Sequence, residues 1–177
     1  MDIHSERLTL EEIGWEDVKI IHQLHSIPEV DEFNTLGIPK DEMATQNIIK
    51  PNIEDQHKTK RSRFCWKIIL KESNQSIGLA GFFLSNDKFK MGDFYYKLFP
   101  EFWGNNYATE TAKAIIKFGF EECKLHRIEA GVATQNIASI KVLEKSGMKR
   151  EGLRRKILPI RGEWKDNFHY AIVESDI

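Results

Sequence analysis

The chain has 177 residues, of which 41% are hydrophobic and 30% charged, a balance that supports a packed core and excludes a disordered chain. Its 26 basic and 27 acidic residues nearly cancel, so no overall positive field favours nucleic acid as a direct partner. No segment reaches about 18 uninterrupted apolar residues and the N-terminus has no apolar run, so we expect a cytoplasmic protein without a membrane partner. The length predicts one domain over residues 1–177.

In chain order, the first predicted elements are a strand and two helices. Loose alternation over residues 7–13 predicts the strand, and apolar residues at helical spacing over 15–26 predict the first helix, which Pro28 stops. The second helix is predicted over residues 40–49, and Pro51 breaks or kinks it.

Three strands come next, and the first two form a hairpin. They are predicted over residues 64–70, 76–84 and 91–98, with turns at 72–74 and 86–87. The remaining predicted elements are a helix at 108–120, a strand at 127–132, a helix at 136–146, and strands at 153–158 and 168–173. This order predicts a mixed α/β fold with a largely antiparallel central sheet flanked by helices.

The two cysteines lie far apart and lack the spacing of metal ligands. Cys65 falls within an apolar segment and Cys123 near the end of a predicted helix, so we expect free thiols and no disulfide. The sequence therefore predicts no metal site.

The segment Pro100–Glu110 joins a strand to a strong helix through a turn rich in glycine and asparagine. Successive backbone N–H groups in such a turn, together with the free N–H groups and the dipole of the helix start, suit a pyrophosphate. An ordinary strand-to-helix connection is the alternative interpretation.

The letters of this segment, PEFWGNNYATE, resemble the coenzyme motif of GNAT (Gcn5-related) N-acetyltransferases, Q/R-x-x-G-x-G/A followed by a helix. They are most similar to the variant P-E-Y-W-G-x-G-Y-A-T-E of the ribosomal-protein-alanine N-acetyltransferases. The motif's second glycine is Asn106 in this chain. Asparagine tolerates positive φ better than most residues, which would preserve the loop's shape; a need for closer backbone approach would instead weaken coenzyme binding.

A second stretch, NIASIKVLEKSGM from Asn136 to Met148, resembles the next GNAT signature, N-x-x-S-x-x-V-L-E-K-x-G-F. Glu151 and Gly152 resemble the E-G pair that comes after it in the same subfamily. The two motifs in this order identify the chain as similar to GNAT enzymes from about Glu6 to Tyr170.

The resemblance implies a splayed sheet and acetyl-CoA as cosubstrate. Its pantetheine arm would contact one splayed strand and its pyrophosphate the loop. The implied coenzyme-binding residues are Tyr96, Lys97 and Leu98, which offer backbone groups, then Trp103, Gly104, Asn105, Asn106, Tyr107, Ala108 and Thr109, and finally Asn136 and Ser139.

Transfer of an acetyl group to an amine needs a proton acceptor and a group that supports the leaving thiolate. Many GNAT enzymes carry a tyrosine for the second task where this chain has Leu143, so Ser139 is the candidate that hydrogen-bonds the sulfur. The subfamily's glutamate is replaced by Leu158, which leaves Asp93 and Glu151 as candidate bases. The plain alternatives are a capping serine and two surface carboxylates.

The acceptor site is expected within residues 28–56, which carry the acidic residues Glu29, Asp31, Glu32, Asp41 and Glu42. An acidic rim would favour a cationic amine, whereas the plain alternative is solvated helix ends. The leading hypothesis is transfer of an acetyl group from acetyl-CoA to a protein N-terminus or small amine by direct attack in a ternary complex. The alternatives are a polyamine or aminoglycoside acetyltransferase and a non-catalytic acetyl-CoA sensor, and either a monomer or a homodimer is compatible with the sequence.

Overall fold

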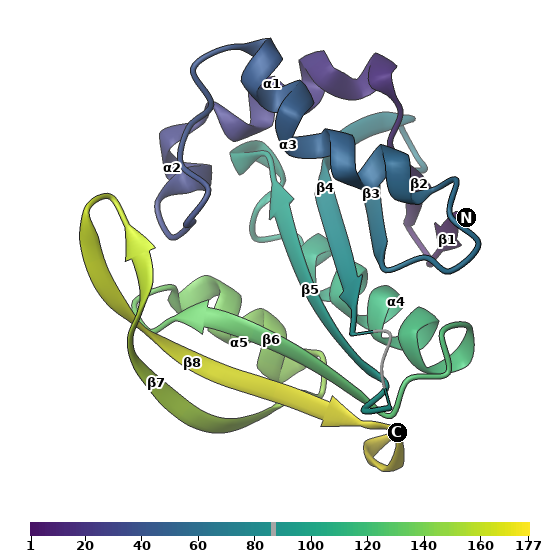
Figure 1. The fold of residues 1–177 in the computed structure, drawn as a ribbon, viewed down its shortest axis with the longest axis vertical. Coiled ribbons are helices and arrows are strands. Elements are labelled where there is room, and N and C mark those ends of the chain that lie inside the picture. The colour runs from purple at the N-terminus through teal and green to yellow at the C-terminus, as the bar shows by residue number, and fades with distance from the viewer. Residues whose placement is uncertain (86–87) are drawn as a thin grey trace.

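A computed structural model describes residues 1–85 and 88–177 (Figure 1), so the turn predicted at 86–87 lies outside the described residues. Eight strands form a sheet in the order β1-β2-β3-β4-β5-β6-β8-β7. The strands are β1 (Ile3–His4), β2 (Leu8–Glu12), β3 (Arg63–Leu70), β4 (Gln75–Leu84), β5 (Met91–Leu98), β6 (Arg127–Ala133), β7 (Lys149–Ile160) and β8 (Glu163–Val173). Every neighbouring pair is antiparallel except β5 and β6, which confirms the predicted mixed α/β fold.

Helices cover both faces of the sheet (Figure 1). The α-helices are α1 (Val18–His25), α2 (Pro28–Asp31), α3 (Glu42–Asp55), α4 (Tyr107–Glu121) and α5 (Ile137–Lys145), and short 3-10 turns occupy Trp15–Asp17, Pro100–Phe102 and Glu174–Asp176. Helices α1, α2 and α3 pack on one face, and α4 and α5 pack on the other. Among the described residues, no helix combines the length and apolar composition needed to span a membrane.

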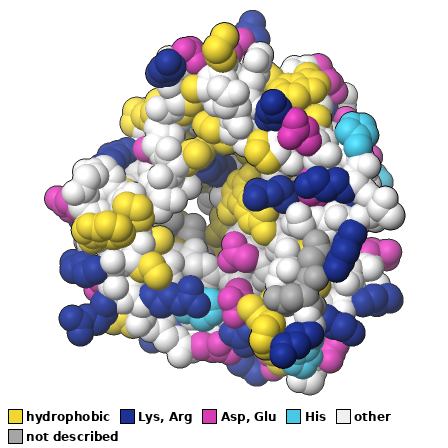
Figure 2. Space-filling model, in the orientation of Figure 1, with side chains coloured by type: hydrophobic (Ala, Val, Ile, Leu, Met, Phe, Trp, Pro, Cys, Tyr) yellow, Lys and Arg dark blue, Asp and Glu magenta, His cyan; other side chains and the backbone are white. Residues whose placement is uncertain are grey.

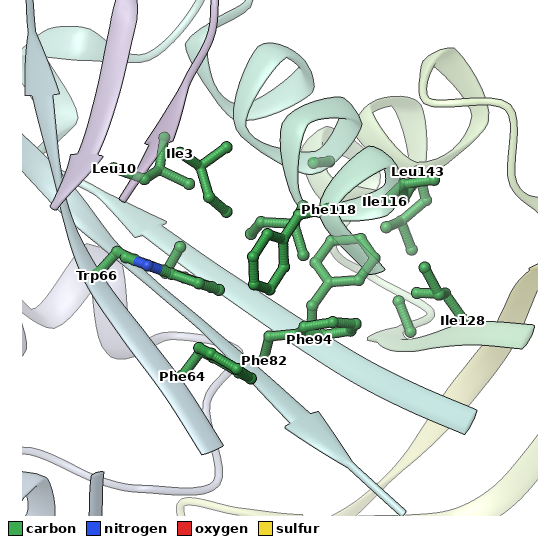
Figure 3. Close-up of a cluster of buried hydrophobic side chains, with 14 of the residues drawn as sticks. Ile3, Leu10, Phe64, Trp66, Phe82, Phe94, Ile116, Phe118, Ile128 and Leu143 are labelled. Atoms are coloured by element: carbon green, nitrogen blue, oxygen red, sulfur yellow. The ribbon is translucent and has the colours of Figure 1, made fainter. Parts of the chain in front are cut away.

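Alternation along the strands sorts the apolar side chains into two cores. On β3, Phe64 and Trp66 point toward α4, whereas Cys65 between them points toward α1 and α3. Figure 3 shows the larger core, in which the Phe118 ring of α4 lies 5.2 Å from the Phe64 ring and 5.6 Å from the Trp66 ring. Both cysteines are free thiols, as predicted.

Of the two proline predictions, the one at Pro51 needs correction. Helix α3 does not end near Pro51 but continues to Asp55. Pro51 is exposed on the outer side of α3, and burial of Ile49 and Ile53 on the inner side offsets the hydrogen bond that proline removes. Helix α1 ends at His25, before Pro28, as predicted. Pro28 itself begins the next helix, α2, because its fixed φ suits a first helical position.

The C-terminal strands are longer than predicted, and β1 was not predicted. Strand β7 begins at Lys149 and β8 at Glu163, so the two form a long hairpin that rises beside α2 in Figure 1. Nearly all of β7 is solvent-exposed, so its sequence lacks the apolar alternation that marks a half-buried strand.

We expect Phe118→Ala to lower the free energy of unfolding by about 3–5 kcal/mol, because it removes a buried ring that contacts three aromatic side chains. Urea unfolding followed by circular dichroism measures the change. Met43→Ala is the control, because Met43 is 69% exposed on α3 and its truncation should change stability by less than about 0.5 kcal/mol. Equal effects of the two substitutions would contradict the assignment of the core.

Candidate functional site

The central feature of the site is the divergence of β5 and β6. The two strands pair in parallel only at Met91–Arg127, Gly92–Ile128 and Asp93–Glu129. Beyond these pairs, β5 stays bonded to β4 as far as Leu98 and β6 stays bonded to β8 as far as Ala133. A cleft of about 690 Å³ opens between the separating strands, and Figure 2 shows this hollow near the middle of the molecule. Its volume lies within the range typical of small-molecule sites.

The loop before α4 closes one end of the cleft and contains two residues in the left-handed region. Gly104 has φ 79° and Asn106 has φ 61°. The Trp103 indole Nε1 donates to Leu98 O (2.9 Å) and the Asn105 side-chain amide donates to Trp103 O (3.0 Å), which ties the loop to itself and to the end of β5. Asn106 therefore supports the left-handed turn at the position of the motif's second glycine, and its Oδ1 accepts a hydrogen bond from Lys145 Nζ (3.1 Å).

The start of α4 presents free backbone amides to the cleft. The first amide of α4 that makes a helical hydrogen bond is that of Glu110, which donates to Asn106 O (3.0 Å). The amides of Tyr107, Ala108 and Thr109 therefore have no acceptor within the helix. All three residues line the cleft, together with the cationic side chains of Lys141 and Lys145. Free N–H groups, the positive end of a helix dipole and two ammonium groups make this end of the cleft suited to a phosphate-bearing anion.

The exposed edge of β5 carries alternate backbone groups. Ser85 N donates to Met91 O (2.9 Å) and Phe99 N donates to Ile77 O (3.0 Å), so the odd-numbered residues of β5 bond to β4. Because neighbouring residues on a strand direct their backbone groups to opposite sides, those of Phe94, Tyr96 and Leu98 face the gap. The backbone of Lys97, by contrast, faces β4, so its location does not match the expected backbone contact with a coenzyme.

Two polar groups on α5 line the opposite wall. Asn136 caps α5, because its Oδ1 accepts from Ser139 N (3.1 Å), and this leaves its side-chain NH₂ available as a donor. Ser139 lies close to the phenol of Tyr96 across the cleft. Burial raises the pKa of Tyr96 to about 12, and the nearby serine hydroxyl opposes this shift. Tyr96 therefore stays protonated at neutral pH, and its O–H can donate a hydrogen bond.

The two carboxylates predicted as bases are outside the cleft lining. Asp93 lies where the strands part, and desolvation by the surrounding protein raises its pKa to about 6, with a further contribution from Glu129 and an opposing one from Arg154. Asp93 keeps contact with solvent, which limits this effect. Glu151 forms a two-armed hydrogen-bonded ion pair with Arg127, which lowers its pKa and holds it as a carboxylate.

The acceptor segment forms the other end of the cleft. Glu29, Glu32 and Phe33 line it, whereas Asp31 is buried behind them. The remaining acids of the predicted rim do not line the cleft: Asp41 caps α3 by accepting from Ala44 N (2.7 Å), and Glu42 begins that helix. The β7–β8 turn closes over this region, where Arg161 Nη2 donates to Pro28 O (2.9 Å).

The side chains of Tyr96 and Lys97 were not predicted as part of the site, because the expected contacts of both residues were through their backbones. Strict alternation along β5 places Phe94, Tyr96 and Leu98 on the α4 side and Tyr95 and Lys97 on the α1 side. The alternation of side chains along a strand, with its period of two residues, follows from the sequence alone. It is sufficient to place the side chains of Tyr96 and Lys97 on opposite faces of β5.

Comparisons with known proteins agree with this geometry. A family profile described as an acetyltransferase (GNAT) domain matches residues 7–149. A Bacillus subtilis protein named uncharacterized N-acetyltransferase YnaD is 30% identical, with 99% of each chain covered. The crystal structure of a GNAT-family acetyltransferase from Bacillus anthracis has a TM-score of 0.85 at 31% identity and 99% coverage of both chains. A spermidine N-acetyltransferase from Vibrio cholerae, in complex with CoA and spermine, has the same fold, with a TM-score of 0.85, 20% identity and coverage of 97% and 98%.

We expect Asn106→Ala to lower the free energy of unfolding by about 1–2 kcal/mol more than Asn106→Gly, because alanine is strained at positive φ and glycine is not. Both substitutions remove the contact with Lys145, so the difference between them isolates the backbone conformation. Urea unfolding measures it, and equal stabilities of the two variants would show that the left-handed conformation is not required.

Proposed function

The chain belongs to the acetyltransferase (GNAT) family, and from this premise we propose that it transfers an acetyl group from acetyl-CoA to a primary amine in a ternary complex. The observation that carries the proposal is the layout of the cleft: an anion-binding loop at one end, an unpaired strand edge along it, and an acidic segment at the other end. Holding both reactants in one cleft supplies much of the acceleration of such a reaction.

The residues of the cleft fit acetyl-CoA, which supplies a thioester carbonyl that an amine can attack. We assign the pyrophosphate to Gly104, Asn105 and Asn106 and to the first amides of α4, with Trp103 bracing the loop. Along the cleft, the free backbone groups of Tyr96, the N–H of Leu98 and the side-chain NH₂ of Asn136 would hydrogen-bond the amides of the pantetheine arm.

For the chemical step, the free N–H groups on the edge of β5 are suited to stabilise the oxyanion that forms when the amine attacks. Tyr96 carries such a group, whereas the parallel pairing of Asp93 with Glu129 uses the N–H of Phe94. The hydroxyls of Ser139 and Tyr96 would donate hydrogen bonds to the departing sulfur, which suits their position on facing walls of the cleft. Asp93 and Glu151 stay predicted bases that could be reached only through water, since neither lines the cleft.

For the acceptor, Glu29 and Glu32 favour a cationic amine over a neutral or anionic one. A polyamine fits this charge, and so does the N-terminus of a protein. The spermidine N-acetyltransferase with the same fold makes spermidine a suitable first probe, alongside a short peptide that begins with alanine.

We expect acetyl-CoA to raise the thermal stability of the protein, by about 2.7 kcal/mol at one hundred times its dissociation constant. Gly104→Val should abolish this shift, because a β-branched residue cannot adopt φ 79° without strain and the loop would rearrange. Gly152→Ala is the matched control, since Gly152 has open space around its Cα and no positive φ. Differential scanning fluorimetry measures the shift; its absence in the wild-type protein at millimolar acetyl-CoA would contradict the proposed coenzyme.

We expect the wild-type protein to release CoA thiol when acetyl-CoA is mixed with spermidine or with the alanine-initiated peptide. Ser139→Ala should lower kcat about tenfold, because it removes one hydrogen bond to the leaving sulfur while the hydrogen bond from Tyr96 remains. A thiol-reactive dye follows the release, and Ser73→Ala in an exposed turn is the control. An unchanged kcat for Ser139→Ala would contradict the proposed role of the serine hydroxyl.

A further inference from the structure

Lys97 has a buried side chain that the proposed function does not yet use. Its backbone bonds to β4, and its side chain points to the α1 face of the sheet while still lining the cleft. Only 9% of the residue is exposed. Within residues 1–85 and 88–177, no hydrogen bond or ion pair of Lys97 Nζ is seen, and the amine is not among the fully buried atoms, so it reaches the acceptor end of the cleft.

The surroundings of Lys97 form a small polar cluster inside an apolar layer. His25 on α1 is 3% exposed, and neither of its ring nitrogens has a hydrogen-bond partner among the described residues. Asp31 on α2 is 5% exposed, and its Oδ1 has no hydrogen-bond partner among the described residues. Its Oδ2 lies 4.0 Å from Arg161 Nη2 on the β7–β8 turn. Buried polar atoms without partners are rare, so this cluster is suited to hold water or part of a ligand.

Burial of Lys97, acting against the nearby carboxylates, favours a fraction of free amine near neutral pH. Burial lowers the pKa of Lys97 to about 8, and the Asp31 carboxylate opposes the shift. Burial also lowers the pKa of His25 to about 3, with additional effects from Lys97 and from His22, so the imidazole is neutral. The carboxylates of Glu29 and Glu32 also line the acceptor end of the cleft.

We propose that Lys97 Nζ is the group that removes a proton from the acceptor amine. This inference rests on the proposed acetyltransferase function and names a proton acceptor for it. Lys97 lines the cleft and lies against the acceptor segment, whereas Asp93 and Glu151 do neither. A role in binding an anionic acceptor fits less well, because Asp31 already faces Lys97 and the neighbouring lining residues are acidic.

Neutral Lys97 takes one proton from the acceptor ammonium, and the freed nitrogen lone pair attacks the thioester carbonyl. A C–N bond forms and the C–S bond breaks, with the bonding pair leaving on sulfur. The second proton on the nitrogen goes to the sulfur, directly or through water beside Ser139, and the Lys97 ammonium then returns its proton to solvent.

A proton acceptor at Lys97 gives the reaction a pH dependence with a definite sign. Because the unprotonated form of Lys97 is active, kcat/KM should rise with pH and level off above about 8. Lys97→Met and Lys97→Arg should each lower kcat about 100-fold at pH 7, since neither side chain can accept a proton. The deficit should shrink toward pH 10, where a primary amine, with a pKa of about 10.4, is increasingly neutral without help.

The experiment measures thiol release from acetyl-CoA with spermidine and with the alanine-initiated peptide, for the wild type, Lys97→Met, Lys97→Arg and the exposed control Lys113→Met. An acetyl-CoA thermal shift in each variant verifies that the protein is folded and binds the coenzyme. Loss of that shift in both Lys97 variants would assign the residue to coenzyme binding and overturn the inference. Activity retained by Lys97→Arg alone would show that only the positive charge matters, which also overturns it.

Two further outcomes separate the inference from the function on which it rests. A wild type that releases thiol while Lys97→Met has the same rate and pH profile contradicts the inference alone. A wild type that releases no thiol with either probe contradicts the proposed function and the inference with it. Independently of any acceptor, the free energy of unfolding of the wild type should increase relative to that of Lys97→Met between about pH 8 and 10. Over this range the unfolded chain keeps a proton on Lys97, whereas the folded chain has lost it.

Discussion

The divergence of β5 and β6 is the constraint on which the rest of the structure depends. A strand in the middle of a sheet normally bonds on both sides, yet β5 loses its second partner after Asp93. Free N–H and C=O groups must be satisfied by water or by a ligand, so the same break that weakens the sheet creates a row of hydrogen-bonding groups along the cleft. An extended chain of amides, such as a pantetheine arm, is complementary to such a row.

The closed end of the divergence must be strong, because it holds the two halves of the sheet together. Helix α4 crosses over this end, and Gly119 allows the close approach: a Cβ there would lie 2.6 Å from Ile128 of β6 and 2.9 Å from Phe82 of β4. Both contacted side chains are fully buried. The helix whose N-terminus is suited to bind the anion thus also joins the two half-sheets, and a change that separates α4 from the sheet would disturb both tasks.

The sequence predicts the strand and helix order well where one face of an element is buried. Residues 91–98 alternate between two cores, and their predicted bounds are those of β5. The prediction fails where burial does not shape the sequence, as in the exposed β7, or where tertiary packing outweighs a local signal, as at Pro51 in α3. The loop from Pro100 to Glu110 was found by its resemblance to a motif, but the positions of Asp93 and Glu151 relative to the cleft depend on the divergence of strands, which no local pattern reports.

Strand β5 separates the two reactants of the proposed reaction. Its alternating side chains place Tyr96 with Ser139 on the α4 side, where the coenzyme loop lies, and Lys97 with His25 and Asp31 on the α1 side, where the acceptor segment lies. Because the gap beyond Asp93 connects these two faces, an amine on one side can meet a thioester on the other only through it. In the proposed reaction, the proton acceptor Lys97 and the Tyr96 hydroxyl that supports the leaving sulfur would therefore lie on neighbouring residues of β5 and on opposite faces of that strand.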